Sequence, residues 1–240
     1  MMRSDAVVVP ELYVGYPGVA FGGYVAGVLA ERSGARTVRV DFRGPVPVGV
    51  PLTIAETAAG GVELGEADRP LAAARPAELL LDVPAAPSWD EAAAAAERFR
   101  DAPPSGVVDC FGCGLRAPDH GLRVHCAPVP DLGLVASAWI PPRAFADPDG
   151  LLPTQLVWGV LDCPGNWAGR FLGTQRPGAV TASLTGSVLR PVAAGERYLV
   201  YAWLLSESGR KHTMGVALAT VGGELCGISE ALWIDPRPAA

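Results

Sequence analysis

The chain has 240 residues, of which 50% are hydrophobic and 18% charged, and its formal net charge is −6. That length suits one large domain or two domains of roughly 100 residues each. The sequence contains no strongly basic block, which argues against a nucleic-acid partner.

The apolar runs and the cysteines indicate the compartment. The first apolar run, at residues 7–9, is too short for a secretory signal, and no later run approaches the roughly 18 uncharged residues of a membrane-spanning helix. Five cysteines are an odd number without secretory context, so we expect reduced thiols. The sequence therefore predicts a cytoplasmic protein without a membrane partner.

The first half predicts an apolar helix followed by strands. Apolar residues keep helical spacing through residues 16–34, and Ser33 and Gly34 supply a stop. A second helix at 89–100 should begin with Ser88 as its N-cap. The proline-containing segment 101–106 then marks a domain boundary, which gives units of residues 1–104 and 105–240. Strands are expected at residues 7–9, 37–42, 52–56, 62–64 and 77–83.

The second half predicts a long helix followed by strands that no helix interrupts. The helix is expected within residues 151–172, after a loop at 141–150. Without alternating helices, the strands should form an antiparallel meander rather than a doubly wound parallel sheet. Strands are expected at residues 122–126, 134–140, 180–189, 197–206, 211–221 and 225–234.

The long helix carries the strongest candidate site. Its apolar residues leave little polar surface before Asp162, so we expect a helix that other structure surrounds on most sides. Burying a carboxylate is costly unless it is paired or used chemically. Pro164 removes an amide donor and should kink or restart the helix. A purely structural alternative is that Asp162 or Cys163 caps the restarted helix.

The two halves look related. Pro45 and Gly49 mark one corner between strands, and Pro191 and Gly195 mark another. The same spacing separates Pro45 from Pro191 and Gly49 from Gly195. Each corner follows an apolar helix that contains glycine and then a strand. A repeat of one helix plus an antiparallel sheet is the simplest account.

At these residues the sequence resembles the hotdog-fold thioesterases, in which a long helix lies wrapped in a strongly curved antiparallel sheet. The Arg-Pro-Val corner at Arg190 and the Cys-Phe-Gly-Cys-Gly segment from Cys110 to Gly114 are similar to motifs of that superfamily. Phe21-Gly22-Gly23 resembles a motif of the double-hotdog acyl-CoA thioesterases of type II. The resemblance implies an α+β double hotdog with two curved antiparallel sheets, each wrapped around a central helix.

The type II resemblance also implies site residues. Its members place an Asp on the second helix, a Thr or Ser on the following strand and a Gln on the last strand. Asp162 matches the Asp, and Thr181 matches the hydroxyl best, with Ser183 and Thr185 as alternatives. No Gln occurs in residues 225–234. Glu230 lies near the position of that Gln. If Glu230 is one residue out of register, its side chain would point to the other face of the sheet.

Thioester hydrolysis needs an activated water and a polarised carbonyl. A carboxylate that takes the water's proton typically increases the reaction rate roughly 10²–10⁴-fold. Amides at a helix N-terminus can hold the oxyanion, and Gly22 and Gly23, or Thr154 and Gln155, would offer them. The first helix has Ala30 where the second has its Asp, which implies at most one site per chain.

Two further groups of residues invite interpretation. Arg190, Arg210 and Lys211 lie at predicted strand ends, where they would meet the phosphates of coenzyme A or remain solvated. Cys110 and Cys113, with His120, His125 and Cys126 nearby, invite a zinc site, but their spacing matches no common finger and favours a tight turn. We therefore expect no metal and no cofactor.

The sequence thus predicts a hydrolase of acyl-CoA or a related acyl thioester, acting in lipid metabolism through a carboxylate-activated water. The alternative is a non-catalytic acyl-thioester or lipid-binding protein of the same fold. Because one chain supplies both helices, the contact between them is expected to be intramolecular. A homo-oligomer built through sheet edges or faces is compatible with this organisation.

Overall fold

The computed structural model describes residues 4–58, 60–117 and 119–237. Within these residues, no helix is long and apolar enough to cross a membrane. The elements in chain order are β1 (Ser4–Val8), β2 (Val14–Tyr16), β3 (Val19–Ala20), α1 (Gly22–Ser33), β4 (Thr37–Phe42), β5 (Pro51–Glu56), β6 (Val62–Glu66), β7 (Arg69–Pro76), α2 (Trp89–Asp101), β8 (Ala127–Val129), β9 (Leu134–Trp139), the 3₁₀ turn η1 (Arg143–Phe145), α3 (Thr154–Val160), α4 (Cys163–Leu172), β10 (Val180–Val188), β11 (Tyr198–Ser208), β12 (Lys211–Thr220) and β13 (Leu225–Ile234).

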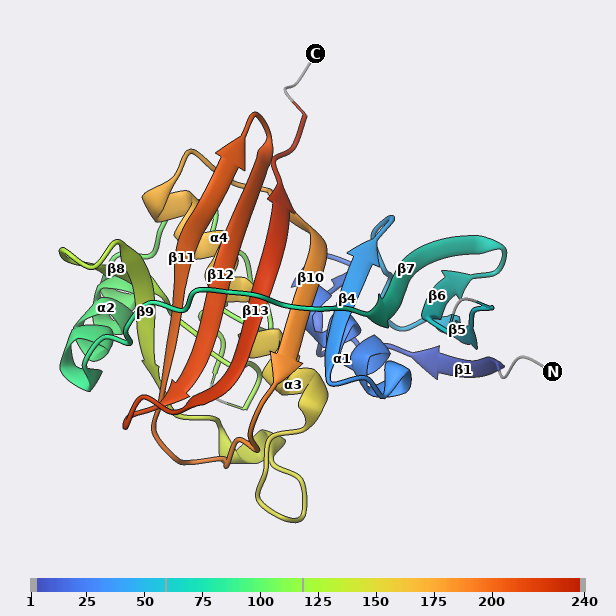
Figure 1. Ribbon diagram of the computed structural model, residues 1–240, viewed down its shortest axis with the longest axis horizontal. Helices are drawn as coiled ribbons and strands as arrows, with labels where there is room; N and C mark the ends of the chain where they lie inside the picture. Colours follow the sequence, from blue (N-terminus) through green and yellow to red (C-terminus); the bar gives the residue numbers. More distant parts are fainter. Residues whose placement is uncertain (1–3, 59, 118, 238–240) are drawn as a thin grey trace.

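One large antiparallel sheet dominates the structure (Figure 1). Its 11 strands lie in the order β1-β5-β6-β7-β4-β10-β13-β12-β11-β9-β8, and β2 and β3 form a separate hairpin. The strands of the two halves of the chain meet where β4 pairs with β10, with Val40 opposite Leu184. The sequence predicts two sheets, whereas the structure joins the strands of both halves into one through this pairing.

The helices α1, α3 and α4 lie against one face of the sheet, which we call the inner face. A side chain at Gly186 of β10 would meet the ring of Trp158 in α3, and Trp233 of β13 lies against Gly165 in α4. Alternate residues of each strand therefore point toward the helices, and the intervening residues point to the outer face. This alternation decides which strand residues can reach a site on α3 or α4.

The segment 77–88 crosses the outer face of the sheet in front of β10, β13 and β12 (Figure 1). The predicted strand at 77–83 is wrong, because this segment forms no strand. Its alternate residues are half-buried, so it lies on the sheet by side-chain contact rather than joining the hydrogen-bonded ladder. Tyr201 of β11 donates a hydrogen bond to the carbonyl of Pro84 at 3.3 Å.

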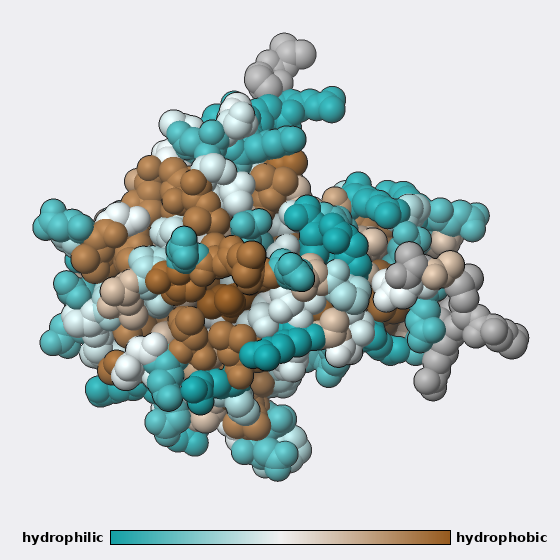
Figure 2. Space-filling model, in the orientation of Figure 1, coloured by the Kyte–Doolittle hydropathy of each residue, from teal (hydrophilic) through white to brown (hydrophobic). Residues whose placement is uncertain are grey.

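The outer face is markedly apolar around this crossing segment (Figure 2). Leu80 of the segment is 92% exposed, and Leu205 of β11 is 39% exposed. Isolated exposed apolar side chains are normal on a protein surface, but Figure 2 shows them gathered rather than scattered. The crossing segment covers only part of the outward-facing apolar side chains of β11 to β13.

Most other predicted elements are confirmed. The four long strands β10 to β13 and the restart of the long helix occur as the pattern predicts. Ser88 caps α2 in a capping box with Glu91, whose amide donates to the Ser88 hydroxyl at 3.3 Å. The predicted strand at 122–126 is wrong, because these residues form no strand and β8 follows them instead.

Helices α1 and α3 approach each other at backbone distance. An added Cβ at Gly23 would lie 2.7 Å from the Cα of Gly159, and one at Gly27 would lie 2.4 Å from the Cα of Gln155. As α1 advances from Gly23 to Gly27, its partner on α3 moves back by the same step, so the helices are antiparallel. Glycine is required at both contacts, since real Cβ atoms do not approach a backbone so closely.

Replacing Gly27 with alanine tests this contact, because the two physical effects have opposite signs. Alanine favours a helix over glycine by about 1 kcal/mol, whereas overpacking costs about 1–3 kcal/mol or more. We expect Gly27→Ala to lower the free energy of unfolding measured by denaturant titration. Gly222→Ala is the control, because the nearest atom there is 3.7 Å away. A Gly27→Ala variant more stable than the parent would contradict the packing.

Candidate active site

The break between α3 and α4 places a carboxylate at the centre of the molecule. Helix α3 ends at Val160, and α4 begins at Cys163 with Pro164 in its first turn. Asp162 lies between the helices, where the amide of Gly165 donates to its carbonyl at 3.1 Å. Proline cannot continue the hydrogen-bonding ladder of α3 but suits the first turn of a new helix. The predicted break is therefore confirmed at this point.

The side chain of Asp162 turns toward the first half of the chain. Its Oδ1 accepts a hydrogen bond from the hydroxyl of Thr181 at 2.9 Å. Its carboxylate also accepts one from the amide of Gly23, in the first turn of α1. It makes no capping hydrogen bond to α4. The carboxylate thus interacts with the positive end of the α1 dipole instead of capping its own helix.

Burial governs the protonation of Asp162, which is only 1% exposed. Desolvation raises the pKa of its carboxyl group to about 7, opposed by the hydrogen bond from Thr181 and the amide of Gly23. Negative charge on Cys110 raises it further. A carboxyl group whose pKa lies near neutrality can both accept and return a proton under ordinary conditions.

Glycine leaves space on one side of this carboxylate. An added Cβ at Gly22 would lie 3.2 Å from Oδ2 of Asp162 and 3.6 Å from the hydroxyl of Thr181. The same position lies 3.7 Å from the ring of Phe42 on β4. The structure therefore brings Gly22, Gly23, Thr181 and Asp162 together and adds Phe42, which no sequence motif marks.

Thr154 and Gln155 lie away from this group, because α1 and α3 are antiparallel. Gln155 packs opposite Gly27 and donates to the carboxylate of Glu31 near the C-terminal end of α1. Gln155 precedes Asp162 by seven positions, which corresponds to about 10 Å along the axis of a helix. The N-terminus of α3 is therefore not part of the arrangement around Asp162.

Glu230 lies on the opposite face of the sheet. It pairs with Thr185 of β10, and both line a cavity on the outer face with Arg39. Its neighbour Ser229 points inward, and its hydroxyl donates to the carbonyl of Leu161 at 2.6 Å. Ser229 thus contacts the last turn of α3 beside Asp162. Sequence reasoning missed it by one position in the strand, and a one-residue register change exchanges the two faces.

The basic residues predicted to bind phosphate are divided between the two ends of the sheet. Arg190 follows β10 at the end far from Thr181 and pairs with Glu224 at 3.4 Å. Lys211 lies in register with Val180 through Ile234, so it shares an end of the sheet with Thr181. Arg210 beside it donates to the carbonyl of Asp235. Of the three basic residues, only Arg210 and Lys211 therefore lie at the same end of the sheet as Asp162 and Thr181.

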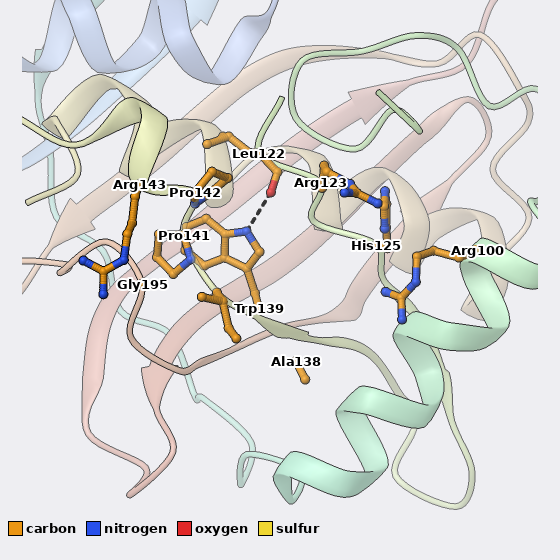
Figure 3. Close-up of a pocket in the computed structure, with 11 residues that line it drawn as sticks. Arg100, Leu122, Arg123, His125, Ala138, Trp139, Pro141, Pro142, Arg143 and Gly195 are labelled. Atoms are coloured by element: carbon orange, nitrogen blue, oxygen red, sulfur yellow. Dashed lines mark hydrogen bonds between the residues drawn. The ribbon is translucent and has the colours of Figure 1, made fainter. Parts of the chain in front are cut away.

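A cavity of about 480 Å³ lies near α2 and the end of β9 (Figure 3). Arg100, Arg123 and Arg143 line it, and none of its lining residues is acidic. Trp139 forms part of its wall and donates from its indole to the carbonyl of Leu122 at 2.7 Å. The three arginines are far apart in the sequence and belong to no motif, so no sequence signal pointed to them.

The zinc set suggested by spacing does not assemble. The imidazole of His120 is 63% exposed, and Nε2 of His125 contacts the carbonyl of Gly114 at 3.1 Å while its ring stacks on Phe99. The thiol of Cys126 faces the carbonyl of Val200. Cys110 and Cys113 lie instead beside Cys163.

Solved structures share this architecture over almost the whole chain. The tesB protein of Mycobacterium avium subspecies paratuberculosis matches with a TM-score of 0.64 and 14% identity, covering 98% of this chain and 93% of that one. An acyl-CoA thioesterase II of Mycobacterium marinum matches with a TM-score of 0.60 and 15% identity, over 98% and 94% of the two chains.

A conserved hotdog-fold protein of unknown function from Alicyclobacillus acidocaldarius matches with a TM-score of 0.59 and 16% identity, over 99% and 94% of the two chains. No family model and no curated protein matches the sequence. At such low identity the likeness shows the fold alone. The chain has a hotdog fold.

Ser229→Ala tests whether the helix break is held from β13. Removing this buried hydroxyl leaves the carbonyl of Leu161 without its donor, which costs about 1–3 kcal/mol in a buried site. We expect that loss in the free energy of unfolding. Ser206→Ala, at an exposed position of β11, should change it by less than about 0.5 kcal/mol. Equal stabilities for the two variants would show that Ser229 does not anchor α3.

Proposed function

We propose that this chain hydrolyses acyl-CoA or a related acyl thioester, with Asp162 activating the attacking water. The observation that carries the proposal is a buried carboxylate held between Thr181 and the amide of Gly23, at the N-terminus of α1. Structural neighbours with the same fold include an acyl-CoA thioesterase II. The fold also hosts other activities, so the site carries the assignment.

In the proposed mechanism, the water lies between Asp162 and the thioester carbonyl, on the side that Gly22 leaves open. Asp162 takes a proton from the water as the water's oxygen attacks the carbonyl carbon. Thr181 and the amide of Gly23 hold the carboxylate in orientation. The carbon–sulfur bond then breaks, and the proton on Asp162 passes to the departing thiolate. The carboxylate is thereby restored.

The developing oxyanion needs a donor other than the Gly23 amide, which is bound to Asp162. The proposal assigns this role to the amide of Gly22, the first residue of α1. Amides there point along the positive end of the helix dipole and need no reorganisation during the reaction. The absence of a side chain at Gly22 lets a carbonyl approach closely.

Substrate entry requires a side chain to move, because Asp162 is 1% exposed. We assign this movement to Phe42, whose ring is the aromatic group beside Gly22. An acyl chain that displaces the ring would keep the site dry, which strengthens the electrostatic interactions there. Arg210 and Lys211, at the same end of the sheet, are assigned to the phosphates of coenzyme A.

We further propose that the chain contains two hotdog units. Antiparallel α1 and α3 each lie against strands of their own half, and β4 and β10 join the halves. Helix α2 packs on the second half, where Arg98 donates to the carbonyl of Pro128 at 2.6 Å and Phe99 contacts Trp167. We therefore assign α2 to the second unit, although the sequence places the boundary at residue 104, and take segment 77–88 as the linker.

Asp162→Asn is the direct test of the catalytic role. Asparagine keeps the shape of the side chain but cannot take the water's proton, so we expect turnover to fall at least about 10²-fold. The assay measures free coenzyme A released from acyl-CoAs of several chain lengths. Melting temperature should show that the variant remains folded. Unchanged turnover in a folded variant would remove Asp162 from the mechanism.

The same assay distinguishes hydrolysis from simple binding. If the protein binds acyl thioesters without hydrolysing them, no acyl-CoA should release coenzyme A. A ligand at 100 times its dissociation constant would nevertheless stabilise the fold by about 2.7 kcal/mol. Stabilisation without turnover would therefore replace hydrolysis with the binding function. Neither effect with any chain length would contradict both.

Thr181→Val tests whether the hydroxyl orients the carboxylate. A hydrogen bond to a charged group is worth about 1.5–3 kcal/mol, so we expect turnover to fall by roughly 10–100-fold. Thr185→Val is a matched control on the same strand, because Thr185 points to the outer face. A similar loss of turnover in both variants would indicate a general effect on β10.

A further inference from the structure

Three buried thiols from distant parts of the sequence meet beside the helix break. Cys110 and Cys113 lie in the loop that precedes β8, and Cys163 is the first residue of α4. Their sulfur atoms all lie within 4.8 Å of one another, and those of Cys110 and Cys163 are 3.7 Å apart. All three are free cysteines. The mechanism above uses none of them.

The loop around Cys110 is folded to hold a sulfur atom. The amide of Gly112 donates to the sulfur of Cys110 at 3.3 Å, and the amide of Cys113 also donates to it. The amide of Gly114 closes the turn by donating to the carbonyl of Cys110 at 2.8 Å. Two backbone donors directed at one sulfur atom favour the thiolate, which is the form that binds metals.

Glycines make this tight turn possible. An added Cβ at Gly114 would lie 2.5 Å from the carbonyl oxygen of Cys110, and one at Gly112 would lie 2.6 Å from the sulfur of Cys163. Side chains at either position would open the turn or push the third cysteine away. The sequence Cys-Phe-Gly-Cys-Gly therefore serves the approach of three sulfur atoms and not only the reversal of the chain.

We propose that Cys110, Cys113 and Cys163 form a binding site for one thiophilic metal ion, Zn²⁺ or Cu⁺. Zn–S bonds of about 2.3 Å in a tetrahedron separate sulfur atoms by about 3.8 Å. The 3.7 Å between Cys110 and Cys163 matches that separation. Thiolate ligands select Zn²⁺ and Cu⁺ over Mg²⁺ or Ca²⁺, which prefer oxygen.

The chemistry of the ligand set follows from charge and coordination number. Each thiol that binds releases its proton, and the ion offsets part of the negative charge of the three buried thiolates, Zn²⁺ more of it than Cu⁺. No fourth His, Cys, Asp or Glu ligand atom belongs to the group among the residues that the structure describes. Three thiolates complete the coordination of Cu⁺, whereas Zn²⁺ takes one further ligand from solution.

Ion binding would join the loop 110–114 to the start of α4. Cys163 follows Asp162 directly, so the ion would fix the helix break from the loop 110–114, whereas Ser229 contacts it from β13. The proposed role of the ion is therefore structural and concerns the position of Asp162. The site does not depend on thioester hydrolysis, and its test uses metal binding as the readout.

The test is anaerobic titration of the reduced, full-length protein with Zn²⁺ and separately with Cu⁺, each against a competing chelator. We expect one ion per chain by elemental analysis. Cys110→Ser, Cys113→Ser and Cys163→Ser should each weaken binding at least about tenfold. Cys126→Ser and Cys226→Ser are matched controls, because both residues are buried free cysteines outside the group, and binding should be unchanged.

Co²⁺ supplies a readout that needs no variant, since thiolate ligation gives intense charge-transfer absorption. We expect this absorption in the unmodified protein and its loss when Zn²⁺ is added. If the protein retains Zn²⁺ or Cu⁺ against the competing chelator, the result supports the site, and the retained ion identifies the metal. Absence of charge-transfer absorption together with no retained Zn²⁺ or Cu⁺ would overturn the proposal. So would equal binding by the Cys163→Ser and Cys226→Ser variants.

Discussion

The position of the Asp162 carboxylate depends on the close approach of two antiparallel helices, α1 and α3, at glycine contacts. Because Gly23 meets Gly159 at backbone distance, the first turn of α1 reaches the carboxylate of Asp162 just beyond the end of α3. A larger side chain at Gly23 would collide with Gly159 and Asp162 and separate the amide of Gly23 from that carboxylate. Burial makes a charge on Asp162 costly, while the helix dipole and Thr181 partly offset that cost. A carboxylate kept in such a place is characteristic of functional sites.

The continuous sheet places groups from both halves around this carboxylate. β10 carries Thr181 and pairs with β4, which carries Phe42, so the site lies where the strands of the two halves join. At the corresponding end of the helix pair the carboxylate, that of Glu31, is exposed rather than buried. There, Gln155 donates to Glu31 beside Ala30, an arrangement without a buried acid. The asymmetry between the two ends supports one site per chain.

Local sequence patterns predicted the features that interactions between residues close in the chain determine. Pro164 marks the helix break, alternation marks the four long strands, and Ser88 marks the start of α2. The sequence did not predict contacts that depend on register and chain crossing. Glu230 and Ser229 differ by one position, yet they lie on opposite faces of β13. Segment 77–88 has strand-like alternation but lies across the sheet, and the approach of Cys163 to Cys110 requires the complete fold.

A single turnover in ¹⁸O-labelled water tests the central claim, that Asp162 activates water and does not attack the thioester itself. The measurement uses enzyme in excess over acyl-CoA and mass spectrometry of both the released acid and the peptide that contains Asp162. The account predicts ¹⁸O in the acid from the first turnover and none in the side chain of Asp162. Unlabelled acid in the first turnover, with ¹⁸O in the carboxylate of Asp162, would contradict it, because that pattern requires an anhydride between the enzyme and the acyl group.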